Sequence, residues 1–417
     1  MDERVYWIWL SNAVTAGSST FAKLLCKFST AEEVYYASDE MIASAITSRS
    51  KDYTALCDKD LTKAEKIHRY CLEKNIGIVV FSDRLFPHML KEIPTPPVLL
   101  YYRGTFPEFD SEFGVAVVGT RRLSRYGRKN AFTISYDLAR SGALVISGMA
   151  LGIDGVAHAG ALSAGKKTVA VIGSGINVLY PKVHGHLARE IVKCGCVISE
   201  FAPFTPPEKQ NFPIRNRLIS GLSVLTLVIE GRERSGALLT ARHARAQDRA
   251  VYALPGNVGN ATSEVTNLLI RNGAVLCTAA DDIVRDYEIR SRGKLNPHEL
   301  AKPSRVNMEE ALSELKISCV SAEDREIFRP TKTERKKKEE DAEEPTATTL
   351  PMPEADLGSF DEKTVRLYQR IPLGDGCLVD SLVDGEMTLR DVMKGLLKLE
   401  MGCFVKMLPG ERVRRNF

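Results

Sequence analysis

Short apolar runs alternate with helical patterns between residues 113 and 290. Each run is followed by Gly or Ser and then by apolar residues at helical spacing. Runs that are apolar on both faces and joined by helices are typical of a parallel sheet covered on both sides. We therefore predict an α/β domain here, an extended Rossmann-like doubly wound sheet whose ligands bind beyond the carboxyl ends of the strands. The predicted strands are 115–118, 143–146, 168–172, 197–198, 224–229, 250–253 and 274–277.

Residues 1–80 show helix-period patterns with short Ser and Gly breaks, which predict a small helical domain. A lead-in segment, 81–112, follows. It begins at the end of a short predicted strand (76–81) and contains a proline-marked loop and a second strand (98–102).

The chain beyond the α/β domain has two different compositions. Residues 291–355 are charged and rich in threonine and proline, which predicts a linker. A lysine run at 336–338 is followed at once by the acidic stretch 339–344, so a solvated linker is favoured over a DNA contact. Residues 356–417 predict three helices (365–368, 378–383 and 387–399) and a β-hairpin (404–408 with 412–415), the pattern of a winged helix.

Composition narrows the class of protein without naming a ligand. The 417 residues are 44% apolar and 26% charged, with a net charge of +4, as in a soluble chain of two or three domains. A mild positive balance does not by itself indicate nucleic acid. No apolar run approaches the roughly 20 residues of a membrane helix, so we expect a cytoplasmic protein. The nine cysteines form no CxxC pair, which predicts neither a disulfide framework nor a zinc site.

Two glycine motifs resemble nucleotide-binding loops but fail on context. Gly173-Ser174-Gly175 begins like GxGxxG, yet a tyrosine and a proline follow where a helix must start. The stretch "GALSAGKK" (160–167) resembles a P-loop but runs from helix to strand. We therefore expect no nucleotide cofactor.

The strand-to-helix turns at the opposite edge of the sheet are better candidates for a binding site. They offer small residues and free backbone N–H groups where an anion is favoured, and basic side chains leave the same region. For any single turn, tight chain reversal is an equal alternative. The candidate site residues are Gly119, Thr120, Arg121, Arg122, Gly148, Lys182, Lys209, Arg215, Asn216, Arg217, Ser235 and Gly236.

The stretch "FPIRNR" (212–217) stands before the apolar run 224–229. We predict an extended approach to that strand, in which Arg215 and Arg217 face the same side, Asn216 faces the other, and neither arginine enters the core. The alternative role for either arginine is a structural pair with a carboxylate such as Glu200 or Glu230.

Catalytic patterns are weak. Asp154 and His158 stand four residues apart and could share a helix face as an acid/base pair, but a helix cap and a packed histidine are favoured. Ser235 lacks a GxSxG elbow, and no metal-spaced set of ligands is present in the sequence. We expect no catalytic residues, no metal and no turnover.

Six ordered motifs carry a resemblance to a known family. They are "VAVVGTRRLSRYG", "SGMALGIDGVAHAGAL", "VAVIGSGINVLYPK", "SEFAPFTPPEKQNFPIRNRLISGLS", "RSGALLTARHA" and "ALPGNV". In order and spacing, the chain resembles the DNA-processing protein A (DprA, also called Smf) family over residues 113–280. The resemblance implies an N-terminal SAM-like helical domain, a Rossmann-type domain that binds single-stranded DNA, and a C-terminal winged helix. It further implies a homodimer that loads the RecA recombinase onto DNA coated with single-strand-binding protein during natural transformation, without catalysis.

The resemblance also ranks the site residues. Arg121 matches the family's basic pocket, followed by Lys182 and Lys209. Three positions depart from the family pattern: Asn177 stands where an acid is common, Gly231 where "EA" is usual, and Val265 where a glycine usually precedes "TN".

Two other classes of protein are weighed against this one. A LOG-like phosphoribohydrolase would carry PGGxGTxxE, but "PGNVGNATSE" displaces Glu264 by one residue, which turns a helical side chain by about 100°. A transcriptional regulator would read duplex DNA with the predicted helix 387–399. Its basic residues are Arg390, Lys394 and Lys398, which indicates a weak duplex contact or a protein-docking role.

Overall fold

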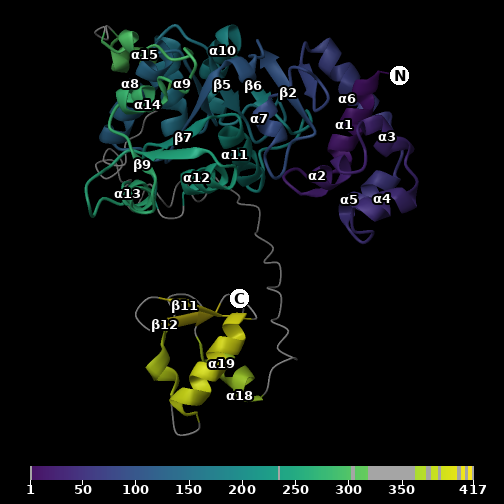
Figure 1. The fold of residues 1–417 in the computed structure, drawn as a ribbon, viewed down its shortest axis with the longest axis vertical. Helices are drawn as coiled ribbons and strands as arrows, with labels where there is room; N and C mark the ends of the chain where they lie inside the picture. The colour runs from purple at the N-terminus through teal and green to yellow at the C-terminus, as the bar shows by residue number, and fades with distance from the viewer. Residues whose placement is uncertain are drawn as a thin grey trace, which may run out of the picture. The chain divides into compact units, whose positions relative to one another are not determined.

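The computed structural model describes residues 2–232, 235–301, 306–317, 362–371, 377–383, 387–401, 405–408 and 412–415. The chain forms two compact units, Met1–Arg329 and Pro330–Phe417 (Figure 1). Within the described residues, no helix combines the length and apolarity needed to cross a membrane.

The N-terminal part of the first unit is helical, as the sequence predicts, and it contains six helices in its described residues. They are α1 (Glu3–Ala13), α2 (Thr20–Leu25), α3 (Ala31–Tyr36), α4 (Asp39–Ala45), α5 (Lys51–Cys57) and α6 (Thr62–Glu73). Side-chain oxygens of Asp2, Thr30, Ser38 and Ser50 cap four of them. The buried Asp52 carboxylate accepts hydrogen bonds from the Thr15 backbone N–H and the Thr20 hydroxyl, which fixes the loop between α1 and α2. The assignment of this helical domain as SAM-like stays a prediction.

A nine-stranded sheet is the centre of the first unit, in the order β1-β2-β6-β5-β4-β3-β7-β8-β9. All seven strands predicted for the α/β domain are present and parallel: β3 (Phe113–Val118), β4 (Ala143–Ser147), β5 (Thr168–Val171), β6 (Cys196–Ser199), β7 (Leu225–Val228), β8 (Ala250–Ala253) and β9 (Val275–Leu276). From β3 the chain builds outward to β6, and then returns to place β7 on the other side of β3. The switch point of this doubly wound sheet therefore lies between β3 and β7.

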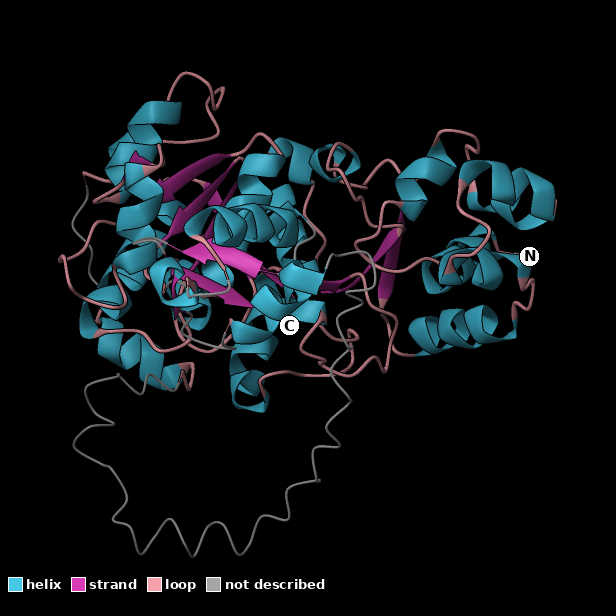
Figure 2. Cartoon of the chain, turned by 90° about the horizontal axis from the view of Figure 1, so that it is seen from below, coloured by secondary structure: helices cyan, strands magenta, loops and turns pink. Residues whose placement is uncertain are grey.

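Helices cover both faces of the sheet (Figures 1 and 2). One apolar core lies under α8 (Arg125–Arg140), α9 (Ile153–Ser163), α10 (Gly185–Cys194) and α14 (Ala280–Tyr287). The other lies under α7 (His88–Lys91), α11 (Asn211–Gly221), α12 (Gly236–Ala246) and α13 (Glu264–Arg271). Alternate residues of β3 enter the two cores: Val115 and Val117 enter one, Ala116 and Val118 the other. This two-sided burial explains the unbroken apolar runs in the sequence.

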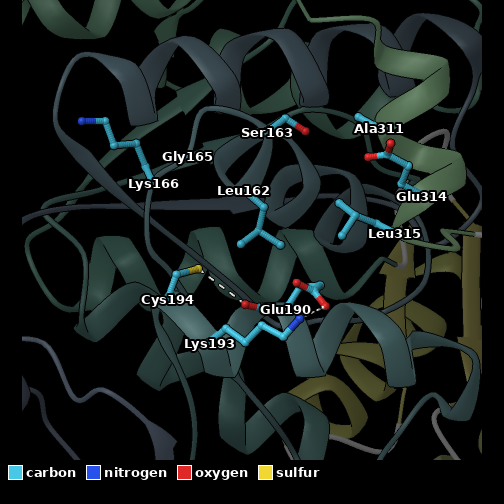
Figure 3. A pocket seen from close by; sticks show the side chains of 10 residues that line it. All are labelled: Leu162, Ser163, Gly165, Lys166, Glu190, Lys193, Cys194, Ala311, Glu314 and Leu315. Carbon is cyan, nitrogen blue, oxygen red and sulfur yellow. Dashed lines mark hydrogen bonds and ion pairs between the residues drawn. The ribbon is translucent and has the colours of Figure 1, made fainter.

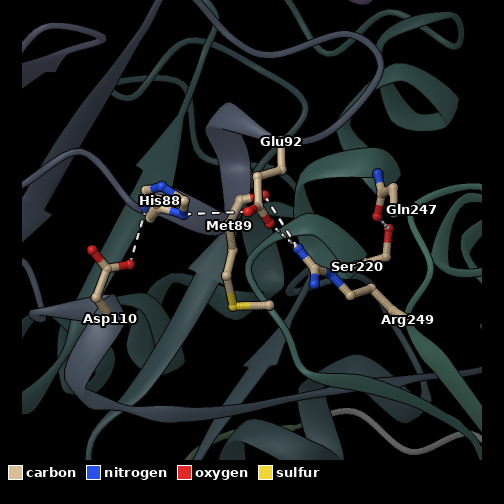
Figure 4. Close-up of polar contacts among 7 residues, drawn as sticks. All are labelled: His88, Met89, Glu92, Asp110, Ser220, Gln247 and Arg249. Atoms are coloured by element: carbon tan, nitrogen blue, oxygen red, sulfur yellow. Dashed lines mark hydrogen bonds and ion pairs between the residues drawn. The ribbon is translucent and has the colours of Figure 1, made fainter.

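The lead-in segment belongs to the same sheet. Its strands β1 (Gly77–Val80) and β2 (Leu99–Gly104) pair antiparallel and extend the sheet from β6. The carbonyl of Met89 on α7 and Oε2 of Glu92, which follows α7, each lie 3.4 Å from Nη2 of Arg249, just before β8 (Figure 4). The backbone N–H of His88 donates to Asp110 (2.9 Å). The contacts with Arg249 fasten the lead-in to the α/β domain, and the His88–Asp110 hydrogen bond joins two parts of the lead-in.

The stretch 212–217 is helical, so the prediction of an extended approach is wrong. Arg215 and Arg217 lie on α11 and are each only 3% exposed, so the prediction that they stay outside the core is also wrong. Pro213 fits the first helical turn, where its missing N–H has no partner to lose. Buried polar residues cover several sides of α11, including Asn216 and Ser220. The helix therefore shows no apolar stripe in the sequence by which to detect it.

Part of the predicted linker is structured. Between residues 291 and 317 lie the 3₁₀ turn η3 (Pro297–Glu299) and α15 (Met308–Glu314). Leu312 on α15 is 3% exposed, and α15 packs against α9. The lysine run 336–338 lies outside the described residues.

The second unit has a small core of its own, which includes Leu367, Val392, Leu396 and Val413. Its elements are α18 (Glu362–Arg370), β10 (Cys377–Leu378), η4 (Val379–Leu382), α19 (Leu389–Met401), β11 (Val405–Leu408) and β12 (Arg412–Arg415). The predicted hairpin is present, and β10 adds a third strand on β12. The predicted helix 378–383 is wrong: it is the end of β10 and a 3₁₀ turn. The winged-helix assignment stays a prediction.

Candidate functional site

A cavity of about 810 Å³ lies at the switch point of the sheet. Its walls come from the turns after β3, β4 and β7 and from the first halves of α11 and α12. Five of its described lining residues are positively charged: Arg121, Arg122, Lys209, Arg215 and Arg232. Asp154 is the single acidic one among them. The cavity therefore favours an anionic ligand.

Nine of the twelve candidate residues line this cavity. They are Gly119, Thr120, Arg121, Arg122, Lys209, Arg215, Asn216, Ser235 and Gly236. Gly148 lines a small adjoining cavity that shares Arg121, Arg215 and Phe212. Lys182 and Arg217 are not among the lining residues of either cavity.

The turn after β3 is held firmly by Glu230, which follows β7. Its buried carboxylate accepts hydrogen bonds from the backbone N–H (3.0 Å) and the hydroxyl (2.5 Å) of Ser124. Its carbonyl accepts from Thr120 N–H (2.9 Å). Ser124 in turn caps α8 through Gly127 N–H. The backbone carrying Arg121 is thus fixed at both ends, while the Arg121 side chain stays exposed.

Aromatic rings lie beside the arginines. The Arg121 guanidinium carbon is 5.3 Å from the ring centre of Phe212, and that of Arg215 is 6.0 Å away. The Tyr180 ring lies 5.4 Å from Phe212 and is 40% exposed. Cation–π contact holds Arg121 over Phe212. The wall therefore presents charge for a phosphate and ring faces for a planar group.

Arg215 brings a buried positive charge to the same wall. Its Nη1 donates to the carbonyls of Gly148 (2.8 Å) and Val171. Burial lowers the pKa of Arg215 to about 10, against the opposing effect of Asp154, so the guanidinium is charged at neutral pH. Burial likewise raises the pKa of Asp154, against the opposing effect of Arg215 and of two backbone N–H donors. A Cβ on Gly148 would lie 2.6 Å from Arg215 Nη1, so the close approach requires glycine.

The N-terminus of α12 lines the cavity and has no side-chain cap. Its N-cap, Ser235, makes no side-chain capping hydrogen bond, and its hydroxyl oxygen is buried without a partner. Asn216 on α11 donates to the Gly236 carbonyl (3.3 Å) and ties the two helices together. Uncapped N–H groups at a helix N-terminus are a ready anion site.

Arg217 has a different partner from Arg215. Its guanidinium donates to Glu200, and the two side chains are 4% and 5% exposed. Both line another small cavity beside Gly17 of the helical domain. Arg217 thus makes the carboxylate pair that the sequence left as an alternative. Lys182 lies on the 3₁₀ turn η2 (Lys182–His184) and is exposed.

The catalytic alternatives have other roles. His158 Nδ1 hydrogen-bonds Thr168 Oγ1 (2.8 Å) and not Asp154. Burial lowers the pKa of His158 to about 3, so the ring is neutral and packed. Glu264, which the enzyme alternative needs at the ribose, is exposed at the start of α13 and is not a lining residue. No group of three or more His, Cys, Asp or Glu side chains suited to a metal ion occurs in the described part of the chain.

The sequence analysis missed Arg232, Pro207, Leu239 and Thr240 as lining residues. Arg232 was detectable, because it lies in the loop between β7 and Ser235 that supplied other candidates. Leu239 and Thr240 line the cavity because α12 runs along it after leaving the sheet. The sequence does not show that direction.

A separate cavity of about 310 Å³ lies between α9, α10 and α15 (Figure 3). Its Lys193 pairs with Glu190 on the same helix (2.7 Å), and Glu314 adds a negative charge. Positive and negative side chains are mixed in this cavity, so it does not favour a ligand of either charge.

The family of this chain follows from its comparison with known proteins. The model of the family described as DNA recombination-mediator protein A matches residues 77–288, the span from β1 to α14. The chain belongs to this family. The DNA processing protein DprA of Bacillus subtilis is 35% identical over 219 residues, which cover 52% of this chain and 74% of that protein. Protein Smf of a Synechocystis strain is 32% identical over 355 residues, 82% of this chain and 81% of the relative.

Among solved structures, that of DNA processing protein A from Streptococcus pneumoniae is similar. It is 31% identical, has a TM-score of 0.60, and covers 69% of this chain and 98% of its own. The recombination-mediator family membership and this likeness agree with the α/β fold predicted from the sequence.

Proposed function

We propose that this chain binds single-stranded DNA in the cavity at the β3–β7 switch point. The observation that carries the proposal is the convergence of Arg121, Arg215 and the uncapped α12 N-terminus around one cavity beside the exposed ring of Tyr180. Guanidinium and N–H groups bind phosphates, and ring faces stack on bases of any sequence. Membership of the recombination-mediator family supports DNA as the anion.

A single strand fits this chemistry better than a duplex does. Stacking on Tyr180 or Phe212 needs an unpaired base whose face is free, and a duplex buries its base faces. Bidentate readout of base edges is not required for binding through phosphates and ring faces. We therefore expect affinity with little sequence preference and a strong dependence on salt.

A finer role is part of the same proposal. We expect a homodimer that protects incoming DNA and loads RecA recombinase onto DNA coated with single-strand-binding protein in natural transformation. We also expect no catalytic turnover, which is supported by the structural partners of Asp154 and His158.

The test is a titration of labelled oligo(dT) at several salt concentrations with the wild-type chain and Arg121→Ala. Loss of one phosphate contact should weaken binding several-fold and flatten the slope of log K against log salt by about 0.7. Arg189→Ala, an exposed arginine on α10, removes the same charge elsewhere and should leave both values unchanged. Equal binding by Arg121→Ala and wild type would refute the pocket assignment.

A further inference from the structure

A second cleft, of about 420 Å³, lies between α6 of the helical domain and the loop that follows β6. Four of its lining residues come from α6: Lys63, Lys66, Ile67 and Tyr70. The loop contributes residues 202–205, and Asn12 of α1 completes the lining. The cleft has two lysines and no acidic lining residue among those described.

The α6 side of the cleft is a basic and aromatic stripe. Lys63, Lys66 and Tyr70 are spaced three and four residues apart, which places them on one helix face. Both lysines are exposed, and Tyr70 is half-buried. This face is therefore directed at solvent in the cleft with its charge available.

The loop side displays an aromatic ring in a costly conformation. Phe204 has φ +70 although it is not glycine, and its side chain is 63% exposed. Its ring centre lies 4.7 Å from that of Tyr70. A left-handed backbone and an exposed large apolar ring both cost free energy, and such features collect at functional sites.

Asn177 holds the two rings together across the cleft. Its Oδ1 accepts from the Phe204 N–H (2.7 Å), and its Nδ2 donates to the Tyr70 hydroxyl oxygen (3.1 Å). The Gly175 N–H donates to the Thr205 carbonyl (2.9 Å) and pins the same loop to the turn after β5. The aromatic pair is thus pre-organised before any ligand arrives.

The cleft and the first cavity are lined by residues of the same loop. Thr205 lines the cleft, while Pro207 and Lys209 line the cavity. Two residues of extended chain span at most about 7 Å, so residues that line the cleft and residues that line the cavity lie close together on this loop. A flexible polyanion that leaves the cavity past Lys209 reaches Phe204 next.

We propose that this cleft is a second subsite for the same single strand, in which Lys63 and Lys66 contact phosphates and a base stacks on Phe204 and Tyr70. The proposal rests on single-strand binding in the first cavity. It assigns the N-terminal helical domain a direct part in holding DNA.

The test compares a short oligo(dT) of about 5 nucleotides with a long one of about 15 nucleotides, using the full chain. In Lys63→Gln/Lys66→Gln, the salt slope for the long strand should fall by about 1.4, the contribution of two single-strand phosphates. Phe204→Ala should weaken the long strand about fivefold or more, the usual loss of one stacked base. Neither change should alter the affinity for the short strand, which the first cavity can hold alone.

Lys23→Gln/Lys51→Gln is the matched control, because it removes two exposed lysines from α2 and α5 of the same domain. Long-strand binding that is unchanged in both cleft variants, while Arg121→Ala still weakens it, would overturn the subsite and leave the proposed function standing. No oligo(dT) binding by the wild-type chain would overturn both. Loss of long-strand affinity equal in cleft and control variants would show a general charge effect and would also overturn the subsite.

Discussion

Arg215 and Arg217 stand two positions apart and have separate roles because they lie on a helix. Two residues on an α-helix are rotated by about 200° from each other, so the side chains leave opposite sides of α11. Arg215 therefore meets the Gly148 carbonyl at the cavity, and Arg217 meets Glu200 beneath the helical domain. An extended chain would have put both on the same side.

The buried Arg217–Glu200 pair predicts a stability effect with a pH signature. Arg217→Met leaves the Glu200 carboxylate buried alone, which should lower the free energy of unfolding by about 3–5 kcal/mol at neutral pH. Burial raises the pKa of Glu200 and Arg217 opposes this, so the variant should raise the pKa further. A carboxyl group whose pKa is higher in the folded state than in the unfolded state destabilises the protein as the pH rises and it ionises. The stability difference between Arg217→Met and wild type should therefore shrink toward about pH 4, where the carboxyl is protonated.

Urea unfolding at several pH values measures this. The double variant Arg217→Met/Glu200→Met should recover most of the loss, because no charge is then left buried. A loss that is the same at all pH values, or that the double variant does not repair, would contradict the pairing as the cause.

Two of the departures from the family pattern touch each other. A Cβ on Gly231 would lie 3.1 Å from the Cβ of Val265, which is fully buried. The missing methyl group at 231 makes room for the larger side chain at 265. The third departure, Asn177, is the residue that joins Phe204 to Tyr70 without adding a negative charge to the cleft.

At the scale of elements, the site depends on two strand-to-helix turns in contact. Gly152 has φ +84, and a Cβ there would lie 2.3 Å from the Thr120 carbonyl oxygen. Ile153 N–H also donates to that oxygen (3.2 Å). The turn after β4 therefore sets the position of the turn that carries Arg121.

Gly152→Ala should displace that turn and weaken oligo(dT) binding in addition to a stability loss of about 1–3 kcal/mol. Gly165→Ala is a matched control: its φ is +65, yet nothing lies within 4 Å of the added Cβ. It should cost about 1 kcal/mol of unfolding free energy, with oligo(dT) affinity unchanged. Thermal unfolding and binding titration of both variants separate backbone strain from displacement of the turn. Equal affinities in the two variants would show that the contact does not position Arg121.

At the scale of the whole molecule, the first unit includes α15, which follows the α/β domain. Arg128 on α8 forms an ion pair with Glu309 on α15 (2.8 Å), and Leu312 is buried beside α9. A chain cut at residue 317 keeps these contacts, and a chain cut at residue 300 loses them.

We expect residues 1–317 to bind oligo(dT) as the full chain does, and residues 1–300 to unfold at lower urea because burial of Leu312 is worth about 1.5–3 kcal/mol.

Duplex DNA should bind the full chain weakly and the 1–317 chain more weakly still, if the C-terminal unit makes the duplex contact predicted from its sequence. Urea unfolding measures the stability expectation, and titration of single- and double-stranded oligonucleotides at two salt concentrations measures the binding expectations. Duplex affinity that is equal in both chains would remove that role from the C-terminal unit.

The sequence by itself determined the parallel sheet, its seven core strands and the turns that carry Arg121 and Ser235. Buried strands and glycine turns leave local signals, namely continuous apolar runs and small residues at fixed places. The nine candidate residues that line the cavity include those on these turns, whereas Arg215 and Asn216 line it from a helix that the sequence predicted as extended chain.

Only the tertiary structure decided that residues 211–221 form the helix α11 and that Arg215 and Arg217 have different partners. Buried polar residues lie on several sides of that helix. The partners of Arg215 and Arg217, Gly148 and Glu200, lie 67 and 17 positions away along the chain. It also decided that β1 and β2 extend the sheet and that α6 meets the loop at Phe204. The Asn177–Tyr70 contact joins residues 107 positions apart, and neither periodicity nor turn chemistry records a contact of that kind.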